Sequence, residues 1–504
     1  MNYSTLVEVY ERLEATTKRL EKTRTIAEFL KTASDLQSIM LLLQGRVYPN
    51  YDERKIGVAA KLVMKSISFA TGTSQTEVEK KWKSLGDLGD TAKELVAKKK
   101  QKTLFKHELT VKKVHQNLTK LSQQEGKGSV DQKMNTIAEL LTSAEPLEAK
   151  YIVRTILEEL RIGVADGVLR DAIVWANFGE DFSENGEISD RDRYNKYVAV
   201  VQEAYDMCND FAKVAEAAKK GLEALGKINL TVGVPIKVML ALKVRDIKEG
   251  FERVGIPAAI EYKYDGFRMQ IHKKDKIQIF TRRLEEVTDQ FPEVAEHVKN
   301  NIKGDSFIID SEAVGYDSKS RKYLPFQNIS QRIKRKYNIK DLSKKMPVEL
   351  NIFDIVQYDG KSLVNEKFSE RRKILEKNVR EEPFKIVLAK NMVATTEEEV
   401  QKFFEESLAK GNEGIMFKAL SAPYKPGARV GYMCKLKPTI DTIDVVVVKA
   451  EWGEGKRSSW LSSYTIACRD EDGNLLEIGK VSTGLKEKPS EGESFEEMTE
   501  LLKP

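Results

Sequence analysis

The sequence predicts a multidomain fold in which an all-α region is followed by an α+β region and then by a short all-β region. Three observations support this prediction. Apolar residues recur at helical spacing through residues 1–222, strands alternate with a few helices over 223–437, and short strand patterns with glycine-rich turns fill 438–504. A chain of 504 residues is also long enough for several domains.

The composition excludes several classes of protein. With 41% hydrophobic residues the chain can bury real cores. No apolar run reaches the roughly 18 residues of a membrane span, and the N-terminus lacks the apolar segment of a signal peptide. The cysteines Cys208, Cys434 and Cys468 are scattered, so neither disulfides nor a zinc cluster is expected. We therefore predict a cytoplasmic protein in a reducing environment.

The charges predict local rather than overall affinity for nucleic acid. A net charge of +6 on 84 basic and 78 acidic residues is mild. Two basic runs are candidate surfaces: Lys98–Lys100 with Lys102, and Arg332 with Lys334–Lys336. A charged fraction of 32%, rich in lysine and glutamate, also suits a thermophile.

The first region reads as helices throughout. Leu6, Val9, Tyr10 and Leu13 illustrate the spacing of three and four residues. Ser74–Glu77 has the pattern of a helix-capping box.

An internal echo is also present in this region. Lys55–Ala59 (KIGVA) recurs as Arg161–Ala165 (RIGVA), and an apolar helix pattern follows each copy. This predicts two related helical units. Glycines at helix starts let backbone amides approach phosphates, although a glycine at these positions can also serve helix packing or a C-cap.

Lys263 is the most informative residue of the second region. Around it Ile260, Tyr262 and Tyr264 alternate with Glu261 and Lys263, as in a strand. Asp265-Gly266 is typical of a tight hairpin turn, with a returning strand from Phe267 to His272. We therefore expect the lysine near the end of a rigid strand, a placement that suits a nucleophile.

Four further segments follow in order. Each is predicted to be a strand or a strand end that carries a candidate site residue. They are Phe307–Asp317 with Glu312, Leu350–Gly360 with Phe353, Asn412–Lys418 with Glu413, and Met433–Pro438 with Lys435 and Lys437. Predicted helices at 285–299 and 366–378 lie between these strands. The final region is predicted to hold strands at 442–452, 463–469 and 475–481.

With these five motifs in order, the chain resembles the ATP-dependent DNA ligases, especially the archaeal and eukaryotic replicative type, from about Met1 into its last residues. The resemblance implies a helical DNA-binding domain (1–222), an adenylation or nucleotidyltransferase domain (223–437) and a partial OB-fold domain (438–504). It implies ATP-dependent sealing of nicks through a lysyl-AMP and a 5′-adenylylated DNA intermediate, in DNA replication, repair and recombination.

The resemblance also assigns roles to residues. Lys263 is the nucleophile. The nucleotide-binding set is Glu261 and Phe353 for adenine, Arg268 and Glu312 for ribose, Lys435 and Lys437 for the α-phosphate, and Arg282, which would contact the nucleotide or the 5′-phosphate of the nick. Glu312 and Glu413 are the expected ligands of Mg²⁺, with Mn²⁺ as a substitute. The sequence has Thr281-Arg282-Arg283 at the position of Arg282, a mild departure from the family pattern.

The expected partners are nicked duplex DNA and a sliding clamp of the PCNA type. The DNA contacts would be Lys55, Gly57, Arg161 and Gly163. The clamp peptide would be Gln101–Phe105, with Gln101, Leu104 and Phe105 as its anchors. We expect a monomer that associates with the nucleoid and not with a membrane.

Three alternatives remain at this point. An RNA ligase or mRNA capping enzyme shares Lys-x-Asp-Gly and the strand set, but lacks a helical region of this kind. A catalytically inactive DNA-binding scaffold would not need the complete set of acidic and basic residues. The third, an NAD-dependent ligase, is disfavoured by the absence of a Cys₄ zinc pattern. The resemblance also implies an Arg-x-Asp-Lys-type motif near the end of the OB domain, which would orient the pyrophosphate of ATP. No such motif follows Lys486. We therefore expect an incomplete OB domain and slow self-adenylylation.

Overall fold

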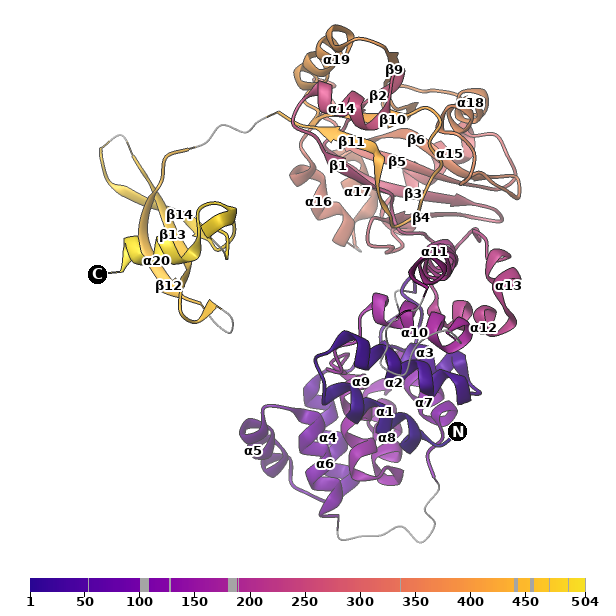
Figure 1. Cartoon of the computed structure of the whole chain (residues 1–504), viewed down its shortest axis with the longest axis vertical. Coiled ribbons are helices and arrows are strands. Elements are labelled where there is room, and N and C mark those ends of the chain that lie inside the picture. Colours follow the sequence, from indigo (N-terminus) through magenta and orange to yellow (C-terminus); the bar gives the residue numbers. More distant parts are fainter. Residues whose placement is uncertain are drawn as a thin grey trace. The chain divides into compact units, whose positions relative to one another are not determined.

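The computed structural model describes residues 1–52, 54–99, 108–126, 128–179, 188, 190–335, 337–438, 443–453, 457–470, 472–487 and 489–503. The chain forms two compact units, Met1–Lys437 and Pro438–Pro504 (Figure 1). The first unit contains a helical region and an α+β region, and the second contains a small sheet. The predicted fold class is confirmed. No described helix has the length and apolar character that crossing a membrane requires.

The helical region forms because its sequence repeats apolar residues at helical spacing. Leu6, Tyr10 and Leu13 are buried as predicted, and the side chain of Ser74 caps a helix by accepting a hydrogen bond from Glu77 N at 3.3 Å. The helices are α1 (Tyr3–Glu14), α2 (Arg19–Thr32), α3 (Leu36–Leu43), α4 (Ala60–Thr71), α5 (Gln75–Leu85), α6 (Leu88–Ala97), α7 (Val111–Gln123), α8 (Ser129–Ser143), α9 (Pro146–Ile156), α10 (Asp166–Phe178), α11 (Arg191–Cys208), α12 (Phe211–Lys220) and α13 (Leu222–Gly226).

The internal echo of the sequence is a structural repeat. Gly57 and Gly163 both have φ +62°, and each lies just before a helix, α4 or α10. The left-handed backbone explains the glycine in both copies. Lys133 of α8 donates to Gly57 O at 3.2 Å, and Lys22 of α2 donates to Gly163 O at the same distance.

Lys22 and Lys133, which we call the lysine braces of the two loops, lie in matching sequences. Residues 22–28 read KTRTIAE and residues 133–139 read KMNTIAE. Helix α2 packs on α10, and α8 packs on α4. The earlier unit therefore braces the loop of the later unit, and the later unit braces the loop of the earlier one.

Two sheets build the α+β region. One has the strand order β1-β11-β10-β2-β9, and the other has β4-β3-β5-β6-β7 with β8 beside β6. The strands are β1 (Leu240–Lys243), β2 (Ala258–Lys263), β3 (Phe267–Lys273), β4 (Ile277–Thr281), β5 (Phe307–Gly315), β6 (Val348–Tyr358), β7 (Lys361–Ser362), β8 (Ile386–Leu388), β9 (Asn391–Ala394), β10 (Gly414–Ala419) and β11 (Arg429–Leu436).

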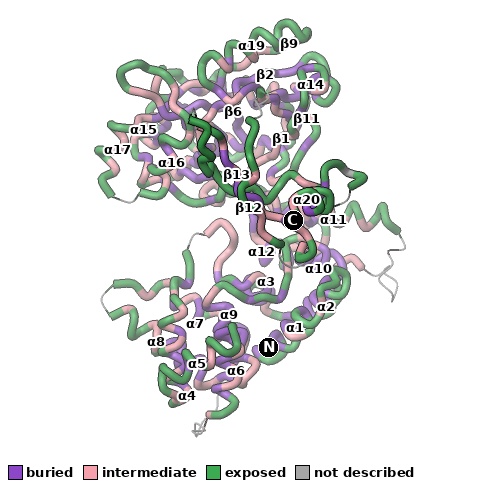
Figure 2. The backbone as a smooth tube through the Cα atoms, turned by 90° about the vertical axis from the view of Figure 1, so that its left-hand side faces the viewer, coloured by how far each residue is buried: buried purple, intermediate pink, exposed green. Residues whose placement is uncertain are grey.

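Helices cover both sheets. They are α14 (Ile247–Val254), α15 (Pro292–Asn301), α16 (Phe326–Lys334), α17 (Ile339–Lys345), α18 (Phe368–Asn378) and α19 (Glu397–Ala409). Helices α14 and α19 contact the first sheet, whereas α15, α16 and α18 contact the second. Each sheet has its own buried apolar cluster. Figure 2 shows the buried segments running along the strands, with exposed residues on the covering helices.

The prediction of a hairpin after Lys263 is wrong. Lys263 ends β2 and Phe267 begins β3, but these strands belong to different sheets. Asp265 and Gly266 carry the chain from one sheet to the other. A Cβ on Gly266 would clash with the carbonyl oxygen of Ala313 in β5, so the crossing depends on a glycine. Strand periodicity does not report which strand pairs with which.

Two other expectations also need correction. The helix predicted at 285–299 is a 3₁₀ turn, Thr288–Gln290, followed by α15, because Val287 N bonds Ile279 O at 2.8 Å and Pro292 starts the helix. Arg332 is fully buried rather than part of a basic surface. It donates to Gln290 O at 3.1 Å and pairs with Glu293.

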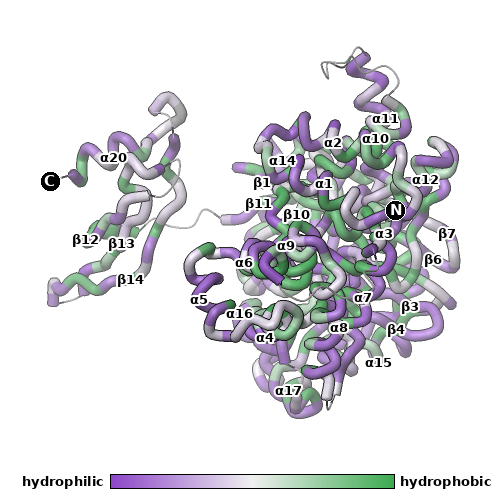
Figure 3. The backbone as a smooth tube through the Cα atoms, turned by 90° about the horizontal axis from the view of Figure 1, so that it is seen from below, coloured by the Kyte–Doolittle hydropathy of each residue, from purple (hydrophilic) through white to green (hydrophobic). Residues whose placement is uncertain are grey.

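The second unit is an antiparallel sheet of β12 (Val446–Trp452), β13 (Leu461–Arg469) and β14 (Leu475–Val481), with helix α20 (Phe495–Leu502) packed against β13. Every residue of β14 is exposed, including Leu475, Leu476 and Ile478. Figure 3 colours the backbone of this strand and its neighbours by hydropathy. The described strands are fewer than the five of an OB barrel.

We predict that Gly266→Ala destabilises the first unit by about 1–3 kcal/mol, because the added methyl group overlaps the backbone of β5. The melting temperature from calorimetry measures this loss. Gly431→Ala is the matched control, since a Cβ there, in β11, meets nothing within 4 Å. Equal melting temperatures for the two variants would contradict the close approach.

Candidate functional site

A cavity of about 940 Å³ lies in the α+β region and is lined by residues of both sheets. Its size suits a small organic ligand. Of the residues predicted from the sequence, the lining includes Glu261, Lys263, Arg268, Arg282, Glu312, Phe353, Glu413 and Lys435. Lys437 lies beside the cavity, and its ammonium pairs with Glu413. The structure therefore brings the five motifs together.

Lys263 and Glu413 form the centre of the site. Lys263 ends β2, and its Nζ lies 2.6 Å from Glu413 Oε2. The backbone holds the pair as well, because Glu413 N donates to Lys263 O at 2.8 Å. Burial raises the pKa of the Glu413 carboxyl, but hydrogen bonds from Lys263 and Lys437 outweigh it and lower the pKa overall. Glu413 is therefore a stable anion beside the lysine.

Positive charge is concentrated around this pair. The pKa of Lys435 is lowered, first by burial and then by the charges of Lys263, Lys437 and Arg282. An anionic ligand would lower the electrostatic free energy of cations that repel one another in a cavity. The arrangement therefore suits a ligand that carries phosphate groups.

Acidic side chains line the site too. Burial raises the pKa of Glu312 to about 7, and Lys263 and Arg268 oppose that rise while Glu413 and Asp265 add to it. Among the described residues no three histidine, cysteine or acidic side chains are grouped to hold a metal ion. A metal ion at Glu312 and Glu413 would therefore need further oxygen ligands from a bound molecule.

Arg268 is fixed by partners that sequence reasoning did not find. It pairs with Asp310, and its Nη2 donates to Tyr424 Oη at 3.0 Å. Tyr424 Oη in turn donates to Asp310 Oδ2 at 2.6 Å. Asp310 lies in an apolar strand and Tyr424 lies outside the five motifs, so the local sequence did not indicate a role for either residue. Arg268 is opposite Glu312 in the β3–β5 ladder.

The far end of the site holds a buried charge pair. Glu261 of β2 is 2% exposed, and its Oε2 lies 2.5 Å from Nζ of Lys418 in β10. The Lys418 ammonium lies 4.9 Å from the centre of the Phe353 ring. The sequence analysis did not assign a role to Lys418. Lys418 is the last residue of the Asn412–Lys418 segment and lies two residues after Met416, which is the cross-strand partner of Glu261.

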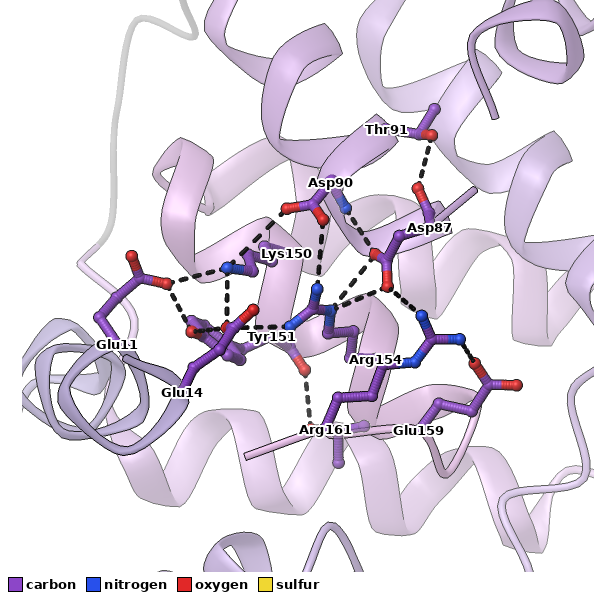
Figure 4. Close-up of polar contacts among 11 residues, drawn as sticks. Glu11, Glu14, Asp87, Asp90, Thr91, Lys150, Tyr151, Arg154, Glu159 and Arg161 are labelled. Carbon is purple, nitrogen blue, oxygen red and sulfur yellow. Dashed lines mark hydrogen bonds and ion pairs between the residues drawn. The ribbon is translucent and has the colours of Figure 1, made fainter. Parts of the chain in front are cut away.

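The candidate DNA contacts of the helical region lie in its two braced loops. Lys55 is exposed. Arg161 is half-exposed, and its guanidinium pairs with Asp87 at 3.0 Å and with Glu159 at 2.5 Å. Figure 4 shows the network beneath Arg161, in which Asp87 also bonds Arg154. The network holds Arg161 in place and partly neutralises it.

The expected clamp peptide lies outside the described residues. Gln101, Leu104 and Phe105 fall between Lys99 and Glu108, where the structure describes nothing.

Comparisons with known proteins identify the family. A family model for the ATP dependent DNA ligase domain matches residues 238–437, and one for the DNA ligase N terminus matches 2–174. The DNA ligase of Nanoarchaeum equitans is 48% identical and that of Thermococcus fumicolans 41%, each over 100% of this chain and 87% of the relative. A solved structure titled Pmar-Lig_PreS3 has a TM-score of 0.53 at 16% identity, over 95% of this chain and 88% of its own.

The fold and the site define a protein that places a lysine among further cations in a cavity large enough for a nucleotide. With relatives of this identity and coverage, the chain belongs to the ATP-dependent DNA ligase family, and its function is ATP-dependent DNA ligation. The archaeal resemblance is confirmed, and the match at 2–174 favours a DNA ligase over the capping-enzyme and RNA-ligase alternatives.

Proposed function

We propose that Lys263 carries out nick sealing through a lysyl-AMP intermediate. The observation that supports this most is the position of Lys263, at the end of a buried strand, in a nucleotide-sized cavity and beside three further cations. In the first step the Lys263 amine forms a bond to the α-phosphorus of ATP. The bond to the β-phosphate oxygen breaks and pyrophosphate leaves.

The neighbouring groups serve this step. The ammonium of Lys263 must lose a proton before it attacks, and Glu413 offers a carboxylate 2.6 Å away. Arg282, Lys435 and Lys437 supply positive charge to the phosphates as the leaving group separates. These roles follow from charge and from their place around the cavity.

The other lining residues would hold the nucleoside. Phe353 offers an aromatic face for adenine, and Glu261 offers a carboxylate to the base. Arg268 and Glu312, opposite each other on β3 and β5, would contact the ribose. Because Tyr424 and Asp310 hold Arg268 in place, a ribose bound to Arg268 would also be held in one position.

A divalent cation fits this acidic and phosphate-rich site. Glu312 and Glu413 would hold Mg²⁺, or Mn²⁺ in its place, together with phosphate oxygens of ATP, because the described residues supply too few ligands alone. Such a cation would neutralise charge on the triphosphate.

Two transfers complete the proposed reaction. The 5′-phosphate at a nick attacks the phosphorus of lysyl-AMP, which releases Lys263 and forms 5′-adenylylated DNA. The adjacent 3′-hydroxyl then attacks the 5′-phosphate and displaces AMP, which closes the strand. We propose that the protein works in this way as a monomer in DNA replication, repair and recombination, inside the cell and at the nucleoid.

The helical region would grip the duplex backbone. Lys55, Gly57, Arg161 and Gly163 lie in two equivalent loops that precede helices α4 and α10. Backbone amides and cations at such loops contact phosphates without reading bases. The matching lysine braces give both loops the same shape, which suits two contacts on one duplex.

We expect Lys263→Ala to reduce covalent AMP labelling to background, because the variant lacks the amine that we propose to attack the α-phosphate. Incubation with α-labelled ATP and Mg²⁺ measures this. Binding to nicked duplex should stay near the parent value. Lys273→Ala, in β3 with its ammonium on Gly304 O at 2.8 Å, is the control and should label normally. Labelling that persists in Lys263→Ala would refute the assignment.

We expect Lys55→Ala with Arg161→Ala to weaken nick binding similarly for all sequences. The slope of log affinity against log salt should shrink by about two, one unit for each lost phosphate contact. Glu159→Gln should strengthen binding, since it removes a carboxylate 2.5 Å from Arg161. Fluorescence anisotropy across a salt series measures both effects.

The control for this experiment carries the same charge loss elsewhere in the helical region. Lys80→Ala with Lys83→Ala, both in α5, should leave the salt slope unchanged. A slope that falls equally in both double variants would show a general charge effect and would remove the role of the loops.

We also propose a sliding clamp as partner, on the sequence of Gln101–Phe105. A glutamine followed by paired apolar residues suits an apolar pocket on such a clamp. Phe105→Ala should abolish clamp binding in a pull-down and leave sealing of short nicked oligonucleotides unchanged. Clamp binding that survives the substitution would remove this partner.

A further inference from the structure

The base end of the nucleotide cavity contains charges that are buried and incompletely partnered. Glu261 and Lys418 are 2% and 6% exposed, yet both line the cavity. Glu261 Oε2 lies 2.5 Å from Lys418 Nζ, whereas Glu261 Oε1 lies 4.0 Å from Arg372 Nη1. Burying such charges is unfavourable unless each finds a partner.

Three of these atoms have no hydrogen-bond partner among the described residues. They are Glu261 Oε1, an acceptor, and the donors Arg372 Nη1 and Lys418 Nζ, of which Lys418 Nζ is ion-paired with Glu261 Oε2. The rest of the Arg372 guanidinium is anchored, since Nε donates to Glu376 at 3.1 Å and Nη2 to Ala389 O at 3.1 Å. Arg372 is not among the residues that line the cavity, whereas Glu261 is. Glu261 Oε1 is therefore an unpartnered acceptor of a lining residue, which indicates a ligand with a hydrogen-bond donor.

Lys418 is held tightly at this place. Its ammonium lies 4.9 Å from the centre of the Phe353 ring and 4.6 Å from that of Phe368. Attraction to the two rings stabilises the ammonium away from water. Lys418 can therefore fix one oxygen of Glu261 and keep the other free to accept.

We propose that Lys418 is a positioning residue that gives the site its preference for adenine, by holding Glu261 as an ionised acceptor for the 6-amino group. This inference rests on the proposed function, in which Phe353 and Glu261 face the base. The 6-amino group is a hydrogen-bond donor, which complements the unpartnered acceptor Glu261 Oε1. A purine without the amino group leaves the buried carboxylate without a donor.

Lys418 has a different proposed role from the other lysines of the site. Lys263, Lys435 and Lys437 cluster around Glu413 and serve the phosphates. Lys418 pairs with Glu261 instead. Its loss should therefore change which nucleotide is used more than how fast the phosphate reacts.

The test compares ATP with purine riboside triphosphate, which lacks the 6-amino group. Single-turnover formation of the lysyl adduct is followed by intact-protein mass spectrometry at a series of nucleotide concentrations. The parent should prefer ATP by about tenfold or more, the size of one hydrogen bond to a charged group. In Lys418→Met that preference should fall toward one. Half-saturation by ATP should need more nucleotide, with a smaller change in the maximal rate.

A double-mutant cycle tests whether Lys418 acts through Glu261. Glu261→Gln should lose the preference by itself, and Glu261→Gln with Lys418→Met should lose no more than Glu261→Gln alone. The double variant also guards against misfolding, since it removes the buried carboxylate that Lys418 neutralises. Lys361→Met is the control, because Lys361 forms an exposed pair with Glu366, and it should keep the parent preference.

The outcomes are distinct. An unchanged preference in Lys418→Met would overturn the inference, as would losses that multiply in the double variant. If neither Lys418→Met nor the double variant folds, Lys418 serves packing and the inference fails. A parent that forms no adduct with either nucleotide would overturn the proposed function itself.

Discussion

The ion pair between Lys263 and Glu413 is the contact on which the site depends. Lys263 ends β2, Glu413 precedes β10 and Lys437 follows β11, so three neighbouring strands of one sheet end at a shared carboxylate. A lysine left alone in a cavity rich in cations would be repelled by them. The shared carboxylate allows several positive charges to gather in the cavity. The crossing at Gly266 joins the two sheets whose residues line that cavity.

The sequence predicted much of the site because strand alternation reports which residues share a face. It placed Glu261 with Lys263, and it identified the strands that carry Glu312 and Phe353. It did not predict the change of sheet at Gly266, because alternation is identical in a hairpin and in a crossing. Lys418 and Tyr424 were missed for a related reason. Their roles depend on contacts between distant segments, and their local sequence does not encode those contacts.

Charge in this protein is neutralised locally, in separate clusters. One end of the cavity has Glu413 among lysines, and at the other end Glu261 is paired with Lys418 and lies near Arg372. Beneath the loop that contains Gly163, Asp87 joins Arg154 and Arg161. Each cluster keeps some cationic or acceptor atoms available to a ligand. This explains how a chain with a net charge of only +6 can present strongly charged sites for both a nucleotide and a DNA backbone.

The exchanged lysine braces of the helical region have a consequence for how that region could have arisen and how it can be divided. Lys22 supports the loop of the later repeat, and Lys133 supports the loop of the earlier one. Neither repeat contains the group that completes its own loop. A fragment that contains one repeat would therefore lack the lysine that bonds its loop, and two associated copies could supply it to each other. This is the arrangement expected of an ancestral homodimer that became a single polypeptide by duplication and fusion.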